Sequence, residues 1–229
     1  MVDVVFPDLP LRDVPLVPIA GETKGIAPRD TEPIDMLRIG GPAAFTVDGT
    51  PGSAYEDKDI VQYLKDHPGD RFWMVHLAPS FAPDDNATIV KAWLRVQLTG
   101  GADVAPVAWS MNPLRVDVPS ELNLSVKIGA DLKFVPVSPS VGVDFKQTII
   151  APLLRAMNEL CDDPFWQFQT TTSERLLGTY RCALIVKGKR GSAVGGAVSL
   201  TANVARKAMG IIPYQGEPPD PSTLTFALV

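Results

Sequence analysis

Apolar and polar residues alternate along most of the chain after residue 70, with the period of two that is typical of β-strands with one buried face. The clearest run covers 124–134, where the even-numbered positions are apolar and the odd-numbered ones are mostly polar. Shorter stretches of β character predict further strands at 72–78, 92–98, 104–109, 114–118, 141–145, 165–171, 180–186, 194–204 and 224–229. Polar, glycine-rich or proline-rich turns separate these stretches.

Two stretches follow helical spacing instead. In 56–67, Ile60, Val61 and Leu64 share one face, acidic residues come first, and the sequence around Pro68 ends the element. In 149–160 one face carries the apolar residues Ile149, Leu153, Met157 and Leu160, and Pro152 fits the first turn. The sequence therefore predicts two short helices.

Together these elements predict a mainly β chain with two short helices (α+β), folded as an antiparallel β-sandwich or a barrel-like sheet. Residues 1–54 contain prolines at short intervals, which argues against long helices and central strands there. Because they are also rich in apolar residues, we interpret 1–54 as an extended Pro-rich N-terminal arm, lying on its own domain or on another subunit. Residues 55–229 are expected to form a single antiparallel β-rich domain.

The predicted strands pair into two hairpins. In the first, 124–134 and 141–145 bring their apolar residues to one face only in certain registers. The register that sets Lys133 opposite Asp144 and Asp131 opposite Lys146 pairs opposite charges, which favours it over its neighbours. In the second, 180–186 is expected to pair with 194–204 through a glycine-rich turn.

Charge narrows the range of partners. The 229 residues carry 21 Lys and Arg against 26 Asp and Glu, a net charge of -5, which argues against nucleic acid. The tight basic cluster Lys187, Lys189 and Arg190 lies in a turn. Its cations and exposed amides are a candidate contact for an anion or an acidic partner, although a turn of this kind also carries glycine and charge for solubility.

Cysteine usage and the N-terminus indicate an intracellular protein. Cys161 and Cys182 are too few for a disulfide framework and have no metal-ligand spacing. The first residues lack a basic segment followed by an apolar run, so we expect no signal peptide and a cytoplasmic location. The longest run without a charged residue, 191–205, is too short and too polar to be a membrane helix.

Candidate chemistry is sparse. His67 lies at the end of a predicted helix and His76 lies in a predicted strand, and no nucleophile motif, metal site or cofactor fingerprint accompanies them. We expect no cofactor and no catalytic residue of these kinds. Acids next to aromatics form one candidate ligand cleft, at Asp162, Asp163 and Trp166, because sugar sites combine these residue types.

These observations favour a non-enzymatic interaction or assembly protein, which binds another protein or its own copy through the N-terminal arm. One alternative is a membrane-active protein that uses its amphipathic hairpins, 124–148 and 180–206. Another is a hydrolase-type enzyme that uses the acids near Trp166.

Overall fold

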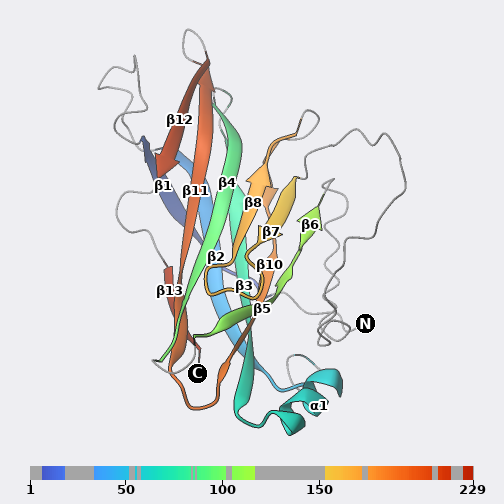
Figure 1. The fold of residues 1–229 in the computed structure, drawn as a ribbon. Helices are drawn as coiled ribbons and strands as arrows, with labels where there is room; N and C mark the ends of the chain where they lie inside the picture. The colour runs from blue at the N-terminus through green and yellow to red at the C-terminus, as the bar shows by residue number, and fades with distance from the viewer. Residues whose placement is uncertain are drawn as a thin grey trace, which may run out of the picture.

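The structure, a computed structural model, describes residues 7–18, 34–51, 55, 58–83, 85, 87–101, 105–116, 153–171, 175–207, 211–217 and 224–228 (Figure 1). Within these ranges it contains thirteen strands and one helix. The strands are β1 (Leu11–Pro18), β2 (Ile34–Val47), β3 (Asp70–Phe81), β4 (Ala87–Thr99), β5 (Val107–Asn112), β6 (Arg115–Val116), β7 (Leu154–Met157), β8 (Phe165–Gln169), β9 (Gly178–Thr179), β10 (Cys182–Lys189), β11 (Val194–Lys207), β12 (Ile211–Glu217) and β13 (Leu224–Leu228), and the helix is α1 (Lys58–Asp66).

The strands form two antiparallel sheets. Sheet A has the order β5-β10-β3-β2-β1, with β9 on β3, and sheet B has the order β12-β11-β4-β8-β7-β6, with β13 on β11. At one side β1 pairs with β12, so the two sheets are continuous there. This arrangement confirms the predicted antiparallel sandwich, rather than the barrel-like alternative.

The alternation read from the sequence explains how sheet B packs. In β4 the residues Ala92, Leu94, Val96 and Leu98 are buried, while Arg95 and Gln97 point outward. β11 follows the same rule opposite β4, with its even-numbered residues buried. Each strand thus sends one row of side chains into the core and one to the outer face.

An aromatic contact joins the two sheets through the core. Phe81 of β3, Phe168 of β8 and Tyr180 meet edge to face, with ring centroids 5.1 to 5.5 Å apart. These contacts belong to a single cluster of buried apolar residues that draws on both sheets. Such edge-to-face contacts add about 0.5–1.5 kcal/mol each to the burial of the rings.

The helix α1 confirms the helix predicted at 56–67. It covers the outer face of sheet A at the lower end of β3 (Figure 1). Its Ile60 packs in a second apolar cluster with Phe72 and Met74 of β3 and Ile185 of β10. Because α1 covers this end of β3, Phe72 and Met74 are buried on the outer face, while Trp73 and Val75 are buried in the core on the inner face.

The helix predicted at 149–160 is wrong for the residues that the structure describes. Leu154–Met157 is the strand β7, which pairs with β8 on one side and β6 on the other. Asn158 and Leu160 have the left-handed backbone angles φ 59° and 65°, which no α-helix can contain. Tertiary pairing has overridden a helical pattern that spans only a few turns.

The hairpin predicted between 180–186 and 194–204 is also wrong. β10 pairs with β3 and β5 in sheet A, whereas β11 pairs with β4, β12 and β13 in sheet B. The turn between them carries the chain from one sheet to the other. Alternation alone cannot distinguish two strands that pair side by side from two that face each other across a core.

A central strand lies inside the predicted N-terminal arm. β2 pairs with β1 on one side and β3 on the other, so prolines in this region did not exclude it. Pro42 falls where the β2–β3 register shifts between Gly40 and Ala43, a bulge at which no ladder bond is required of it. The neighbouring Gly41 has φ 92°, and a Cβ there would lie 2.6 Å from the carbonyl oxygen of His76.

The end of the chain behaves as predicted, since β13 adds to an edge of sheet B beside β11. The hairpin predicted at 124–146, with Lys133 opposite Asp144 and Asp131 opposite Lys146, lies outside the described residues. Residues 1–6, 19–33 and 52–54 of the predicted N-terminal arm also lie outside the described residues.

Candidate functional site

The two histidines occupy structural positions. His76 lies on β3 with only 2% of its surface exposed, and its ring contacts Phe45 edge to face. Burial lowers the pKa of His76 to about 4, so the ring is neutral at pH 7. His67 follows α1, with its ring stacked on Tyr63 and Nδ1 3.1 Å from the Tyr63 carbonyl oxygen.

The thiols and acids form no metal-binding cluster in the described ranges. Cys182 is buried in β10, where burial raises its pKa, and Cys161 is exposed; neither forms a disulfide. Nowhere in these ranges do three His, Cys, Asp or Glu side chains gather as a metal ion would require. A reactive thiol needs the opposite environment to that of Cys182.

The basic cluster is organised around one buried carboxylate. Asp70, at the start of β3, is 4% exposed and accepts hydrogen bonds from Tyr63 (2.9 Å) and Lys189 (2.5 Å). Lys187 lies 3.3 Å from the other side of the same carboxylate. Arg190 instead lies exposed in the turn, where its backbone N–H donates to Gly69. The predicted trio is thus divided, because two of its cations share Asp70.

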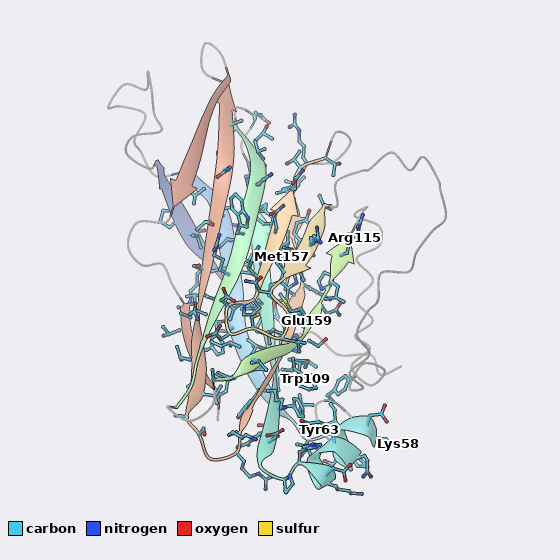
Figure 2. All side chains as sticks on the ribbon, viewed as in Figure 1. Lys58, Tyr63, Trp109, Arg115, Met157 and Glu159 are labelled. Atoms are coloured by element: carbon cyan, nitrogen blue, oxygen red, sulfur yellow. The ribbon has the colours of Figure 1, made fainter. Side chains whose placement is uncertain are left out.

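Aromatic rings complete this arrangement beside α1. The Lys187 ammonium lies 4.5 Å from the ring centroid of Trp109 and 5.4 Å from that of Tyr63. Trp109 comes from β5 and Tyr63 from α1, and both are labelled in Figure 2. A cation held over two rings and beside a carboxylate joins α1, β3, β5 and β10 at one point.

The pKa values follow from these contacts. Burial alone would raise the pKa of the Asp70 carboxyl, but hydrogen bonds from Lys189, Tyr63 and Lys187 outweigh it and lower the pKa. Burial would lower the pKa of Lys187, but its contacts with Tyr63 and Asp70 raise it overall. Both groups are therefore charged at neutral pH, and an incoming anion at Lys187 would compete with Asp70.

The residues of the predicted acidic cleft point in different directions. Trp166 is 0% exposed and its Nε1 donates to the carbonyl oxygen of Pro113 at 3.0 Å. Asp162 and Asp163 lie in an exposed turn, and the backbone of Asp162 accepts from Leu98 N–H at 2.7 Å. The structure therefore does not bring these two carboxylates to the indole ring of Trp166.

A shallow hollow lies close by, on the outer face of sheet B. It has a volume of about 240 Å³, and its polar and aromatic lining consists of Arg95, Gln97, Asn158, Asp163, Phe165 and Ser199. Strand register accounts for the grouping, since Arg95 pairs with Phe165 on one side and with Ser199 on the other. Asp163 is thus the one member of the predicted cleft that lines this hollow, and Phe165 takes the place expected for Trp166.

Most of these lining residues were not found from the sequence. The alternation in 92–98 marks Arg95 and Gln97 as outward-facing. It carries no signal, however, that β8 and β11 flank β4, because strand order depends on long-range pairing. That pairing is what brings Phe165 and Ser199 beside Arg95.

Two exposed leucines lie close in sequence to β6 and β7: Leu114 immediately precedes β6, and Leu160 follows β7 and donates its backbone N–H to Ala108 of β5. β6 and β7 run antiparallel, with Arg115 opposite Arg155. Next to this pair, the Ala156 N–H donates to the carbonyl oxygen of Leu114. Leu114 is 53% exposed and Leu160 is 50% exposed. Figure 2 labels Arg115, Met157 and Glu159 along this same edge.

No protein-family model matches this chain, and no curated protein matches it. Among solved structures, the chain is similar to Clostridium perfringens delta-toxin at 8% sequence identity and a TM-score of 0.29, over 82% of this chain and 87% of that one. This likeness is too weak to assign a family or a function. Within the described part of the chain, no helix has the length and apolar character to cross a lipid bilayer.

Proposed function

We propose that this chain is a non-enzymatic assembly protein, which associates with a second copy through the β6–β7 edge. The proposed edge patch takes in Leu114, which immediately precedes β6, and Leu160, which lies three residues after β7 and donates its backbone N–H to Ala108 of β5. The exposed charged residues Arg155 and Asp162 belong to the same part of the chain as Leu160. The observation that carries the proposal is Leu160, a bulky residue with a left-handed backbone and half of its side chain in water. The strain costs about 1–2 kcal/mol, and the free chain gains little burial in return.

The chemistry of the patch suits a copy of itself. Arg155 and Asp162 are both exposed, so the patch carries both signs of charge. Under a two-fold axis the same patch faces itself, which lets each charge meet its opposite on the partner. The leucines would then cover one another instead of facing water, at about 25 cal/mol for each Å² of apolar surface buried.

Sedimentation velocity of the full chain, over a range of concentrations, tests this proposal. We expect the wild type to form dimers and the double variant Leu114→Asn/Leu160→Asn to remain monomeric. Leu177→Asn is the matched control, because Leu177 is 67% exposed but lies beside β9 on sheet A. A monomeric wild type, or a dimer that the double variant leaves intact, would contradict the proposal.

Assembly through the N-terminal arm, the route expected from the sequence, needs a revised experiment. Removing residues 1–50 would delete β1 and β2, which are paired inside sheet A, so loss of a dimer would then report only misfolding. Removing residues 1–6 leaves both strands whole. If that shorter deletion alone abolishes the dimer, the arm rather than the β6–β7 edge forms the contact.

A second candidate function, insertion into a membrane, is favoured by one further observation. In the sequence the segment 117–152 follows β6 and precedes Leu153 and β7, and β6 and β7 are antiparallel neighbours. The described residues on either side of a sequence with amphipathic alternation are therefore close together at a sheet edge. Its stretch 124–134 matches the roughly 9–11 residues that a membrane-crossing strand needs.

Co-flotation with anionic vesicles at low salt tests this second function. The variant Ile128→Asp places a charge on the apolar side of the alternation, and Ser125→Asp places the same charge on the polar side. We expect the wild type and Ser125→Asp to float with the vesicles and Ile128→Asp to stay in solution. Absence of flotation for the wild type, or equal flotation of the two variants, would contradict membrane insertion.

A further inference from the structure

The hollow on the outer face of sheet B exists because small residues alternate with long ones. Ala197 of β11 pairs directly with Gln97 of β4, and Ser199 pairs with Arg95. The short side chains on β11 leave space beside the long ones on β4. Phe165 of β8 closes the far side of Arg95, and the turn that holds Asn158 and Asp163 closes one end.

Its side chains are held in place before any ligand arrives. The Arg95 guanidinium lies 5.4 Å from the ring centroid of Phe165, which orients its planar group. The Asn158 side-chain amide donates to the carbonyl oxygen of Asp163 at 3.3 Å, and the Gln97 amide donates to that of Asp162 at 3.5 Å. Since each amide is tethered through its nitrogen, its orientation is restricted. Preorganisation of this kind lowers the entropy that binding must offset.

The charge and polarity of the hollow exclude several classes of ligand. A phosphate or another strong anion would meet the Asp163 carboxylate and find only one guanidinium. A cation would meet Arg95. A wholly apolar ligand would find the ring of Phe165 with Ala197 and Val96 among five hydrogen-bonding side chains, whereas pockets for apolar compounds are lined mostly by apolar side chains.

The class of ligand that is not excluded, and that matches the lining of the hollow, is a single neutral ring rich in hydroxyl groups. Paired amides, a carboxylate, a guanidinium and the Ser199 hydroxyl offer both donors and acceptors to hydroxyl groups. The face of Phe165 can pack against C–H groups of such a ring. The volume of about 240 Å³ is below the roughly 300–1,000 Å³ of pockets for drug-sized ligands, which limits the occupant to one small ring.

We propose that this hollow binds a neutral sugar residue, with Phe165 against the ring and Arg95, Gln97, Asn158, Asp163 and Ser199 on its hydroxyl groups. The site is shallow and open, so the sugar would be the end of a glycan or a free monosaccharide. The hollow adjoins the patch proposed for self-association, because Asn158 and Asp163 belong to the same turn as Leu160 and Asp162. The sugar proposal does not require a dimer, since Gln97, Phe165 and Ser199 lie on β4, β8 and β11 of one chain.

Saturation-transfer NMR of the full chain tests the proposal with a defined set of probes. The neutral probes are the methyl glycosides of glucose, galactose and mannose, with N-acetylglucosamine and N-acetylgalactosamine; glucuronate and methyl phosphate, whose C–H protons report binding, are the anionic ones. We expect at least one neutral sugar to bind with a millimolar or lower Kd and neither anion to bind at this site. Gln97→Ala should weaken the sugar about tenfold.

Gln167→Ala is the matched control for Gln97→Ala. Both glutamines point outward from neighbouring strands of sheet B. Gln167, however, pairs with Trp93, the outward-facing residue of β4 before Arg95, and does not line the hollow. Because both are surface residues, neither substitution threatens the fold. The proposal is overturned if no neutral probe binds, if an anion binds in its place, or if Gln97→Ala and Gln167→Ala have equal effects.

Discussion

Lys189 Nζ lies 2.5 Å from Oδ1 of Asp70, so the last residue of β10 is tied to the first residue of β3. The same carboxylate also accepts from Tyr63, which brings α1 into the contact. If Asp70 lost its negative charge, the positive charges of Lys187 and Lys189 would remain close together with no carboxylate between them. The contact therefore links the end of β10 and the start of β3 to the helix that covers sheet A.

We expect Asp70→Asn to lower the free energy of unfolding by about 1–3 kcal/mol at pH 7. The estimate is below that for a fully buried ion pair because water still screens the two lysines. Urea unfolding measures it, with the exposed Asp66→Asn as the control. An equal stability of wild type and Asp70→Asn would contradict this role of Asp70.

The effect of Asp70 should also depend on pH in a defined direction. Its folded pKa is lowered, so its stabilisation is complete above the unfolded value of about 3.9 and is lost as the pH falls through the folded pKa. The stability difference between wild type and Asp70→Asn should therefore be constant from pH 7 to about pH 5 and disappear at lower pH. A difference that stays constant down to pH 2 would refute this assignment.

His76 should make the wild type less stable between about pH 6.5 and pH 4. Its folded pKa of about 4 lies below the unfolded value, so the unfolded chain takes up a proton that the folded chain does not. The resulting loss approaches about 3 kcal/mol at the low end of this range. An NMR titration of the two imidazole rings measures the folded pKa directly, and a value for His76 near 6.5 would show the prediction to be wrong.

Trp166→Phe should lower the free energy of unfolding by about 2–4 kcal/mol. The indole is fully buried, and its loss leaves the Pro113 carbonyl oxygen without this donor as well as creating a cavity. Trp93→Phe is the matched control, because Trp93 is only partly buried on the outer face of the same sheet, and we expect less than about 1 kcal/mol there. Urea unfolding, analysed with the same m-value for the wild type and both variants, measures the two changes in the free energy of unfolding. Equal decreases for Trp166→Phe and Trp93→Phe would contradict the role given to the buried hydrogen bond.

The sequence was most informative where residues close to one another in the chain determine whether a side chain is buried or exposed. The alternation in 92–98 correctly separated Leu94 and Val96, which are buried, from Arg95 and Gln97, which face outward. The helix at 56–67 was predicted correctly for the same reason, since Ile60 and Leu64 are one turn apart. The spacing of apolar residues and the residues that end a helix or strand act over a few neighbouring positions, so what they predict does not depend on distant partners.

Features that depend on distant partners were not predicted. Leu153 and Met157 have helical spacing, but their segment forms a strand because Met157 pairs with Phe165 and Leu154 with Phe168. Phe165 lies beside Arg95 only because β8 follows β4 in the sheet order. The candidate hollow therefore required the structure, whereas the outward orientation of two of its residues did not.

Leu160→Asn should stabilise the isolated chain while weakening its self-association. Asparagine tolerates a left-handed backbone better than leucine does, so the substitution relieves strain at φ 65°, and the half-exposed leucine gives up little burial. We expect a gain of up to about 1 kcal/mol in the free energy of unfolding of the monomer, together with a weaker dimer. Leu114→Asn is the matched control: Leu114 is equally exposed but has no left-handed backbone to relieve, so it should weaken the dimer without the gain. Dilute urea unfolding and sedimentation velocity of the same samples measure the two effects, and a Leu160→Asn chain that is less stable, or that dimerises as the wild type does, would contradict the proposal that this strain is kept for assembly.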